Sequence, residues 1–463
     1  MKHLKIFTLI LTSVAFFSCR EDRTYEYEAL TAQDVWIKEQ MDNLYLWKND
    51  MPADNKLNFF QESDVFFKSL LSTKCQNGKG DRYSYLETLS SSTKSIQEES
   101  TYGFDFFLFQ PSQTPKQLVA RIIYVLKDSP AEQAGLKRGD WISEVNGEKL
   151  TSSNYHLLYS GNETSITRAQ ADTTNSIAVW TDTDILSVAA ARPLEDSPFL
   201  VDTVYSYAGK QIGYLLYNRF SSGISTTPSN QTYDQQLLAS FAKYQSMQVT
   251  EFILDLRYNS GGLLSCAQLL ASLLAPSEKM GEPFCHLSFN ELNTERDTTY
   301  ALSADLAKGK NLNLKTLYVI TGSRTASASE AVINGLKPYI DVRLIGSVTE
   351  GKNVASLSIS SPKFPDIILH PIVAQVSNGT NETDYSKGLT PDYSYSEEDE
   401  ATFADTIYAL GDTHEYLLKQ ALAIINGETV LPSKSPRRQL QLRPFKTATP
   451  RTGCLRIDTS DNN

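Results

Sequence analysis

The sequence has few cysteines, fewer basic than acidic residues, and no long apolar run beyond its N-terminal segment. Its 43 Lys and Arg residues stand against 54 Asp and Glu, a net charge of −11. An acidic chain repels phosphate backbones, which argues against nucleic acid as a partner. The mature chain lacks the roughly 20 uninterrupted apolar residues of a membrane-spanning helix. With 41% apolar residues over 463 positions, it can still build packed cores and has room for about three domains.

The N-terminal segment has the pattern of a secretion signal. Lys2 and Lys5 precede a mainly apolar stretch over residues 6–17, and the chain turns polar directly after Cys19. A cysteine at this point resembles bacterial lipoprotein signals, in which the matching residue carries the lipid. We therefore expect residues 1–19 to be a lipoprotein signal peptide and Cys19 to be the lipid anchor, the mature chain's only attachment to a membrane. The expected location is the cell envelope of a Gram-negative bacterium, at the periplasmic or surface face of the outer membrane. The alternative is an ordinary signal peptide with an incidental cysteine.

The five cysteines are widely spaced and include no Cys-x-x-Cys pair, so they indicate neither a zinc site nor a redox motif. If Cys19 is lipidated, four remain. In an oxidising compartment these could form one or two disulfides, and free or buried thiols are an equal alternative.

Two kinds of pattern divide the mature chain. Residues 34–71 have apolar residues near the helical period, which predicts helices. Short strands follow, interrupted by a short helix within residues 129–140, where Pro130 suits the first turn and Gly135 the C-terminal cap. From about residue 205 strands alternate with helices, which predicts a layered α/β domain with a largely parallel sheet. The expected strands are 103–109, 118–125, 141–145, 176–180, 186–191, 211–217, 251–256, 316–321 and 342–346, and the expected helices there are 233–247, 261–274, 327–339 and 414–425.

Two strand-to-helix turns carry the residues best suited to chemistry. In residues 255–262 (DLRYNSGG), Gly261 and Gly262 would leave backbone amides open to an anion or a developing oxyanion at a helix N-terminus. In residues 321–330 (TGSRTASASE), the hydroxyl of Ser327 would lie at a helix start. Each turn also has a purely structural explanation. The first could be a plain tight turn, and in the second Ser327 and Glu330 have the spacing of a capping box.

A lysine beyond the next strand favours the catalytic interpretation of these turns over the structural one. Lys352 follows the strand expected over residues 342–346. Carboxyl ends of neighbouring parallel strands lie side by side, so Ser327 and Lys352 can converge where α/β enzymes place their sites. A lysine accepts a proton only when it is uncharged, and burial lowers its pKa from about 10.4. We therefore expect Lys352 to be buried with its nitrogen near Ser327.

Several motifs, in order, resemble the carboxyl-terminal processing peptidases, also called tail-specific proteases. They are residues 255–262, residues 325–330, the pair Gly351 and Lys352, and residues 387–392 (KGLTPD). Residues 129–140 are similar to part of the PDZ module inserted in that family, and residues 81–86 resemble the segment that leads into it. The resemblance runs from about residue 31 to residue 427.

The resemblance implies a fold and a mechanism. The fold class would be α/β, with a crotonase-like (ClpP/crotonase) layered catalytic core, an inserted PDZ domain and a helical N-terminal segment. The implied site consists of Ser327 as nucleophile, Lys352 as base, and the amides of Ala328 and of Gly261 or Gly262 as oxyanion donors, with no metal or cofactor. The family commonly has a glutamine four positions after the lysine, and Ser356 stands there in this chain. Support of the dyad would then come from a shorter side chain.

The PDZ-like module would bind peptides by strand addition and capture a terminal carboxylate in a backbone loop. The loop expected to do so consists of Tyr102, Gly103, Phe104, Asp105 and Phe106. Alternatively, these residues are simply the start of the module's first strand.

Five segments are therefore predicted: a signal peptide over 1–19, a helical region over 20–95, a PDZ domain over 96–195, a catalytic core over 200–430, and a poorly ordered tail over 431–463. The predicted function is an envelope serine endopeptidase that cuts protein or peptide substrates toward their C-terminal region. Two rivals stay open. One is an inactive peptide-binding scaffold, motivated by Ser356, and the other is a ligand-binding protein with a crotonase-like core. The sequence indicates no particular oligomeric state.

Overall fold

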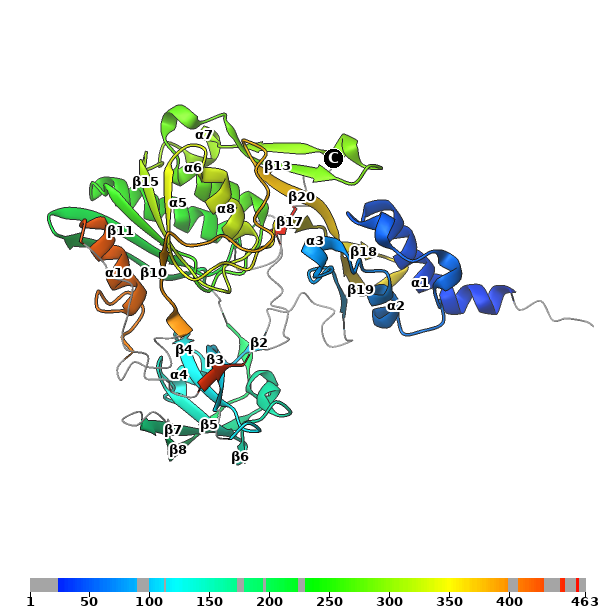
Figure 1. Ribbon diagram of the computed structural model, residues 1–463, viewed down its shortest axis with the longest axis horizontal. Coiled ribbons are helices and arrows are strands. Elements are labelled where there is room, and N and C mark those ends of the chain that lie inside the picture. Colours follow the sequence, from blue (N-terminus) through cyan, green and yellow to red (C-terminus); the bar gives the residue numbers. More distant parts are fainter. Residues whose placement is uncertain are drawn as a thin grey trace, which may run out of the picture.

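The computed structural model describes residues 24–89, 100–111, 114–172, 179–194, 197–223, 230–398, 407–428, 442–445 and 455–457. The predicted signal peptide with Cys19 lies outside these residues, as does Cys454. Figure 1 shows an N-terminal helical region to the right of a larger α/β core, and a module of residues 100–194 beneath that core, which is called the inserted module from here on. No helix within the described ranges is both long and apolar enough to cross a membrane.

The N-terminal region is built from short helices rather than one long helical stretch. α1 (Thr24–Leu44) and α2 (Ser63–Ser69) bury apolar side chains in one cluster. The prediction of helix across residues 34–71 is wrong between them, where only the turns η1 (Lys48–Asp50) and η2 (Asp54–Lys56) occur. Pro52 accounts for part of this break, because a proline forces the preceding residue into an extended conformation. α3 (Cys75–Gly78) follows, and β1 (Tyr85–Thr88) then pairs with β19 (Phe364–His370), beside β18 (Ile359–Ser361), which ties the region to the core.

The inserted module is an antiparallel sheet with its own apolar core. Its elements are β2 (Ser100–Thr101), β3 (Phe104–Pro111), β4 (Val119–Val125), α4 (Pro130–Gln133), β5 (Trp141–Val145), β6 (Glu148–Lys149), η3 (Tyr155–Tyr159), β7 (Thr164–Asp172), β8 (Val179–Val188) and β9 (Arg192–Pro193). Two predicted strands, 176–180 and 186–191, prove to be the single strand β8, and its partner β7 was not predicted. The reason is chemical: polar residues occupy most positions of β7 and separate the apolar residues of β8 with the run Thr-Asp-Thr-Asp, so no regular apolar alternation marks either strand.

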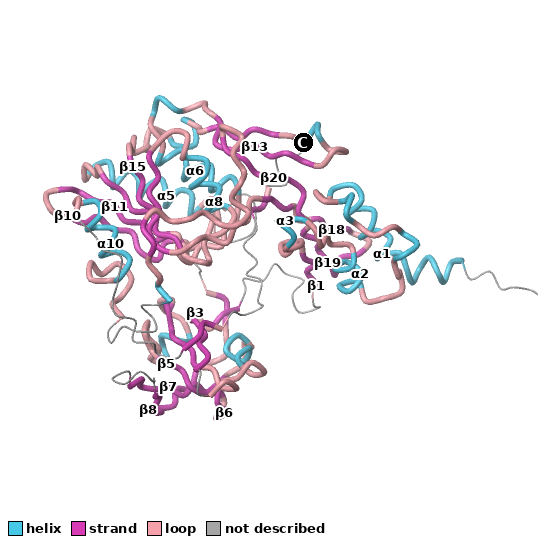
Figure 2. Tube along the Cα trace, in the orientation of Figure 1, coloured by secondary structure: helices cyan, strands magenta, loops and turns pink. Residues whose placement is uncertain are grey.

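The α/β core is centred on a six-stranded sheet in the order β10-β11-β12-β15-β16-β21. β10 (Phe199–Tyr207) runs antiparallel to β11 (Lys210–Tyr217), and β12 (Glu251–Asp255), β15 (Thr316–Thr321), β16 (Asp341–Gly346) and β21 (Tyr393–Ser394) continue parallel to β11. Side chains alternate between the faces of this sheet. Leu254 joins the cluster with α5 (Thr232–Ser246), α6 (Leu264–Leu274) and α8 (Ala328–Leu336), whereas Ile253 joins the cluster with α10 (Tyr416–Ile425). Helices therefore cover both faces (Figure 2).

A second sheet packs on the far side of α8, in the order β14-β13-β20-β17-β23. Its strands are β13 (Pro283–Phe289), β14 (Thr298–Ala301), β17 (Val354–Ser356), β20 (Ile372–Asn378) and β23 (Leu455–Arg456), with η4 (Ser277–Lys279), η5 (Thr294–Arg296) and α7 (Ala304–Ala307) nearby in the chain. The expectation of an unstructured tail needs correction here. Its described parts form β22 (Leu442–Pro444), on β3, and β23, on β17, because each adds to an edge that other strands provide.

The cysteines that the structure describes are thiols that take part in no disulfide. Cys75 is half-buried, and Cys266 and Cys285 are buried. Burial raises the pKa of Cys75 to about 11, so this thiol is protonated at neutral pH.

Candidate active site

Three turns meet at the carboxyl ends of β12, β15 and β16. The strands are parallel neighbours, with Asp255 opposite Ile320 and Thr321 opposite Gly346. Turn A (residues 256–263) follows β12, turn B (residues 322–327) follows β15, and turn C (residues 347–353) follows β16. This convergence is the one expected from the strand-helix pattern.

Backbone hydrogen bonds join the three turns. The Ala326 amide donates to the Asn259 carbonyl at 3.1 Å, which connects turn B to turn A. The Glu350 amide donates to the Thr325 carbonyl at 2.9 Å, which connects turn C to turn B. The site is therefore a hydrogen-bonded assembly of loops rather than three independent ends.

Ser327 is buried at the start of α8 in a strained conformation. Its φ of 62° and ψ of −112° lie where residues other than glycine rarely occur. Such a backbone costs on the order of 1–3 kcal/mol and persists only when its surroundings hold it. A Cβ on Gly261 would lie only 2.8 Å from the Ser327 Cβ, so glycine at position 261 is what lets turn A approach this serine.

Glu330 holds turns B and C together. One of its carboxylate oxygens, Oε2, accepts hydrogen bonds from the backbone amides of Ser327 and Lys352, each at 2.8 Å. The other, Oε1, accepts from the Gly351 amide at 2.7 Å and from the Thr349 hydroxyl at 2.5 Å. The bond to Ser327 is the one that a capping box provides. The other three show that this glutamate also fixes the turn that carries Lys352, so Ser327 and Lys352 are held through one carboxylate.

The Glu330 carboxylate is completely buried, and burial raises its pKa to about 7. The four hydrogen bonds favour the charged form and oppose that shift without cancelling it. Burial is the largest cause of this value, so Glu330 is a buried acid whose pKa lies near neutrality.

Lys352 is buried too, with 4% of its surface exposed. Its Nζ lies 4.8 Å from the centre of the Tyr83 ring, in the segment that leads from the N-terminal region toward the inserted module. The Arg82 guanidinium donates to the Tyr83 hydroxyl at 2.7 Å and pairs with Glu350 at 2.9 Å. Tyr83 thus forms one wall around the lysine side chain.

The candidate oxyanion donors differ in their hydrogen bonding. The Gly261 amide already donates to the Asn259 side chain at 2.9 Å. The amides of Gly262 and Ala328 donate to no other residue in the described part of the chain. Gly262 also has a φ of 140°, and a Cβ there would lie 2.1 Å from the Phe220 carbonyl. Of the two glycines, Gly262 therefore offers the available donor and Gly261 the close approach to Ser327.

Ser356, which stands at the glutamine position of the resemblance, is completely buried in β17. Its carbonyl accepts a hydrogen bond from Ile457 at 3.2 Å. The motif at residues 387–392 packs on turn C, where the Leu389 amide donates to the Thr349 hydroxyl at 2.7 Å.

The predicted carboxylate loop lies at the start of β3. Tyr102, Phe104 and Phe106 are buried in the core of the inserted module, so only their backbone can face a ligand. Gly103 has a φ of 80°, and a Cβ there would lie 2.2 Å from the Ser129 Cβ, which makes glycine necessary at this position. Asp105 is buried and accepts a hydrogen bond from Arg324 of turn B at 2.6 Å. The loop is thereby connected to the turn that carries Ser327.

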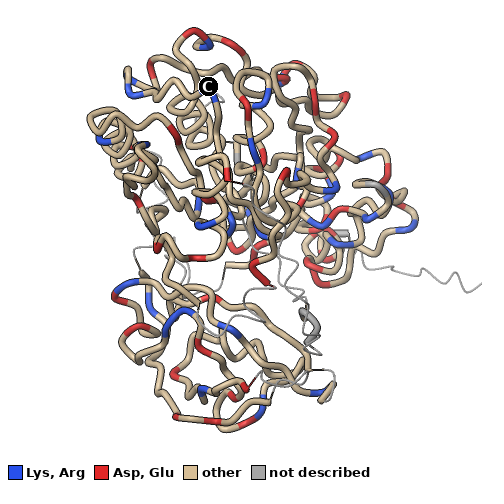
Figure 3. Tube along the Cα trace, turned by 60° about the vertical axis from the view of Figure 1, so that its left-hand side comes forward, with Lys and Arg blue, Asp and Glu red and all other residues tan. Residues whose placement is uncertain are grey.

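The inserted module also joins the core through buried charges. Arg257 of turn A donates to Asp255 at 2.8 Å and to Glu415 at 2.6 and 3.0 Å. Arg138, from the inserted module, reaches Glu397 at 3.1 Å and Glu415 at 3.3 Å. Figure 3 shows acidic and basic positions along the chain on both sides of this junction. Burial opposes ionisation of Glu415, but the Arg257 and Arg138 guanidiniums outweigh it and keep its pKa below the usual value.

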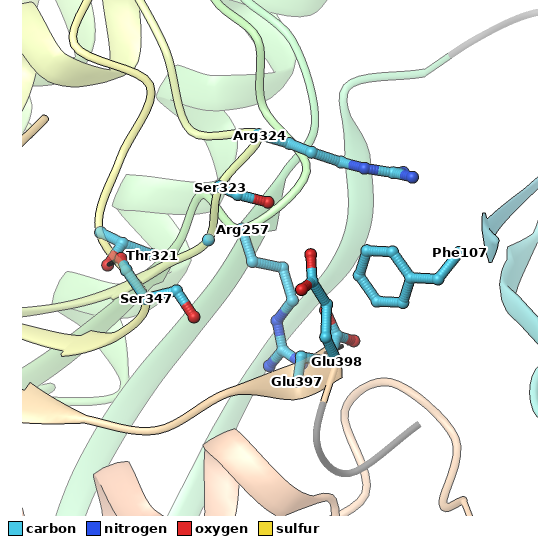
Figure 4. Close-up of a pocket in the computed structure, with 9 residues that line it drawn as sticks. Phe107, Arg257, Thr321, Ser323, Arg324, Ser347, Glu397 and Glu398 are labelled. Atoms are coloured by element: carbon cyan, nitrogen blue, oxygen red, sulfur yellow. Dashed lines mark hydrogen bonds and ion pairs between the residues drawn. The ribbon is translucent and has the colours of Figure 1, made fainter. Parts of the chain in front are cut away.

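A small polar cavity lies at the same junction (Figure 4), and Lys352 is not among the residues that line it. It holds about 20 Å³, about enough for one water molecule. Its lining consists of Phe107, Arg257, Thr321, Gly322, Ser323, Arg324, Ser347, Glu397 and Glu398. Most of these residues are polar or charged, so they do not form an apolar ligand pocket.

Three contributions were not predicted from the sequence. Glu330 was interpreted only as a cap, and its contacts with turn C could not be read from its spacing. The pairing of Arg324 with Asp105 bridges more than two hundred positions of chain. Tyr83 belongs to the motif over residues 81–86 that resembles the family. No pattern in the sequence indicates that its ring lies beside Lys352.

Three family models match separate parts of the chain. The model of peptidase family S41 matches residues 211–395, which include all three turns. The model of the peptidase S41 N-terminal domain matches residues 32–85, and a PDZ domain model matches residues 121–157 within the inserted module.

Individual proteins agree with these models. The crystal structure of a Bacteroides fragilis protein assigned to the S41 proteases is 35% identical, with a TM-score of 0.73, and the similarity covers 85% of this chain and 97% of that one. A carboxyl-terminal-processing protease of Picosynechococcus sp. is 26% identical over 57% of this chain and 60% of its own length. A Staphylococcus aureus protein named as a probable CtpA-like serine protease is 24% identical over 64% of this chain and 53% of its own length. The matches thus span little more than half the length of these two curated relatives.

Proposed function

The chain belongs to peptidase family S41, and from this premise we propose that it is a serine endopeptidase that hydrolyses peptide bonds toward the C-terminal region of protein substrates. Ser327 is the nucleophile and Lys352 the general base. The observation that carries the proposal is the Glu330 carboxylate, which binds the backbone amides of both residues at 2.8 Å. One buried group thereby sets the relative position of the two turns. The core is proposed to be crotonase-like, in keeping with its two packed sheets and the helices between them.

In the proposed reaction, the Ser327 hydroxyl attacks the scissile carbonyl carbon while the Lys352 amine takes its proton. The oxygen that becomes negative accepts hydrogen bonds from the amides of Ala328 and Gly262. The C–N bond then breaks, Lys352 returns the proton to the leaving amine, and an acyl-enzyme ester on Ser327 remains. Lys352 next takes a proton from water, which attacks the ester and releases the new carboxylate and the Ser327 hydroxyl.

The burial of both side chains supports these roles. Ser327 and Lys352 are 1% and 4% exposed, so the attacking hydroxyl and the amine are shielded from bulk water. The inserted module, a PDZ domain by its family model, would dock the substrate by strand addition on β3.

Hydrolysis of casein, and of a peptide that carries a tagged C-terminal tail, tests the activity. We expect Ser327→Ala and Lys352→Ala each to lower kcat/KM by about a thousandfold or more. Ser323→Ala is the matched control, because Ser323 lies in the same turn but is exposed. Peptide binding should survive in Ser327→Ala. A wild-type protein that binds peptides without cutting them would support the inactive scaffold motivated by Ser356 instead.

The location is also proposed, from the sequence of the N-terminal segment. Cys19 would carry a lipid and hold the protein at the Gram-negative envelope. Incorporation of labelled palmitate into the wild type, and its loss in Cys19→Ser, is the expected result. Equal labelling of both forms would contradict lipidation at this residue.

A further inference from the structure

Residues 442–445 of the C-terminal tail lie on the edge of β3, the strand that begins in the predicted carboxylate loop. β22 pairs antiparallel with β3, with Leu442 opposite Pro111 and Pro444 opposite Phe109. The Phe445 amide continues this ladder by donating to the Leu108 carbonyl at 2.8 Å. β4 takes the opposite edge of β3, so the tail takes the edge to which a peptide strand would add. Figure 1 shows this short red strand over β3.

One aromatic side chain anchors the tail strand. The Phe445 ring lies 5.9 Å from the Tyr155 ring in an edge-to-face arrangement and packs against the apolar core of the inserted module. A backbone ladder combined with a side chain in an apolar site is how strand-addition ligands bind.

The tail runs along β3 in the direction expected of a bound peptide, toward the predicted carboxylate loop. Its partners on β3 descend from Pro111 to Leu108 as the tail proceeds, so the tail runs toward Gly103. Phe106 precedes Leu108 by two residues in β3, so it is the next position that the antiparallel tail would reach. Its carbonyl faces the same edge of the strand as the Leu108 carbonyl. It accepts from the Arg324 side chain at 2.7 Å. The tail and Arg324 thus take successive hydrogen-bonding positions on one edge.

A second part of the tail lies on the strand that follows Lys352. β23 pairs parallel with β17, with Leu455 opposite Ala355. The Ile457 amide donates to the Ser356 carbonyl at 3.2 Å, and its side chain is buried in the main apolar cluster of the core. The tail therefore contacts both the peptide edge of the inserted module and the neighbourhood of the candidate dyad.

Charge favours this docking. Residues 431–463 contain seven Lys and Arg residues and two Asp residues, in a chain whose net charge is −11. A cationic tail is attracted to the acidic remainder of the chain, which raises its local concentration at these edges.

We propose that the tail, through β22, Phe445 and β23, is an intramolecular ligand of the inserted module that competes with protein substrates for the edge of β3. The proposal rests on the proposed function only in naming substrates as the competitor. Peptides that displace the tail would be extended, cationic segments with a bulky aromatic residue. A substrate strand must therefore displace the tail from the edge of β3, and this competition lowers the apparent affinity of the substrate.

Three forms of the protein test this, each carrying Ser327→Ala so that no peptide is cut. One is the full chain, one ends at residue 440 and lacks both tail strands, and the matched control ends at residue 450 and keeps β22. The probe is a fluorescein-labelled peptide of residues 438–449, followed by anisotropy. We expect it to bind the form ending at 440 at least about tenfold more tightly than the other two. Phe445→Ala in the full chain should give an intermediate affinity.

Equal affinity in all three forms, or no binding to the form ending at 440 while circular dichroism shows it folded, would overturn the docking. The same truncations with Ser327 intact are then assayed on casein. Faster hydrolysis by the form ending at 440 supports competition between tail and substrate, and an unchanged rate overturns it. If no form cuts casein but the binding order holds, the peptidase activity fails and the docked tail stands.

Discussion

Two buried glutamates, one in the candidate active site and one at the junction with the inserted module, show how differently this fold uses the same residue. Glu330 and Glu415 are both fully buried. Among the described residues, three backbone amides and one hydroxyl donate hydrogen bonds to Glu330, and its pKa is raised to about 7. Glu415 faces Arg257 and Arg138, and its pKa is lowered. The first is a support that can lose its charge near neutral pH, and the second is charged at neutral pH and connects two parts of the molecule.

The largest effect is expected from Arg257→Leu, which leaves Asp255 and Glu415 buried without their main cation. Breaking such a pair costs about 3–5 kcal/mol, because the remaining charges stay desolvated. Urea unfolding followed by circular dichroism measures the loss. Arg343→Leu is the control: its pair with Asp341 is at the surface and is worth less than about 1 kcal/mol. Equal losses of unfolding free energy in the two variants would show that the buried ion pairs of the junction contribute no more to stability than a surface pair.

Glu330→Gln should mainly affect catalysis. A glutamine has one acceptor oxygen, and its amide group would face donors, so at least two of the four bonds that position turns B and C are lost. We expect kcat to fall about 10–100-fold with a smaller change in KM, measured on a peptide substrate. Glu278→Gln, on an exposed residue, serves as the control. A Glu330→Gln enzyme with wild-type kcat would show that this carboxylate does not position the dyad.

The pH dependence should separate the two glutamates by sign. Because the folded pKa of Glu330 lies above its ordinary value of 4.5, its contribution to stability is complete below about pH 4.5 and is lost as pH rises through about 7. The contribution of Glu415, whose folded pKa is lowered, is present above pH 4.5 and is lost as pH falls below it. Activity should instead fall as pH drops through about 7, because a protonated Glu330 no longer accepts all four bonds.

Two measurements check these signs. Unfolding free energies between pH 4 and 8 should change less with pH in Glu330→Gln than in wild type. The rate of wild-type hydrolysis should have an acidic limb near pH 7. A stability profile that is identical in the two proteins would contradict the raised pKa.

The smallest effect is expected from Arg324→Ala, which removes the link between Asp105 of the inserted module and the turn that carries Ser327. Hydrolysis of a long substrate that must dock on β3 should change by about three- to tenfold. Hydrolysis of a short peptide that cannot reach the module should change less. Arg324→Lys, which keeps the charge, should lie between. Equal changes for long and short substrates would mean that Arg324 acts only on the turn itself.

Much of the site was predictable because its signals are local. Apolar strands that end in DLRYNSGG and in TGSRTASASE marked turns A and B, and the order of the motifs indicated the family. The parallel alternation of strands and helices then implied that these ends lie together. In contrast, β7 and β8 carry no regular apolar alternation, although Ile166 and Val188 join the core of the inserted module, and the tail strands β22 and β23 are too short to have such a pattern.

What the amino-acid sequence determined by itself is the chemistry available: a serine at a helix start, a lysine after the next strand, and glycines that permit close approach. Tertiary structure alone decided which groups meet. Only folding brings the Glu330 carboxylate to the Lys352 turn, Arg324 to Asp105, and the tail to the edge of β3. These contacts join residues that are distant in the chain, and their geometry depends on the whole sheet. For this reason no local sequence pattern predicts them.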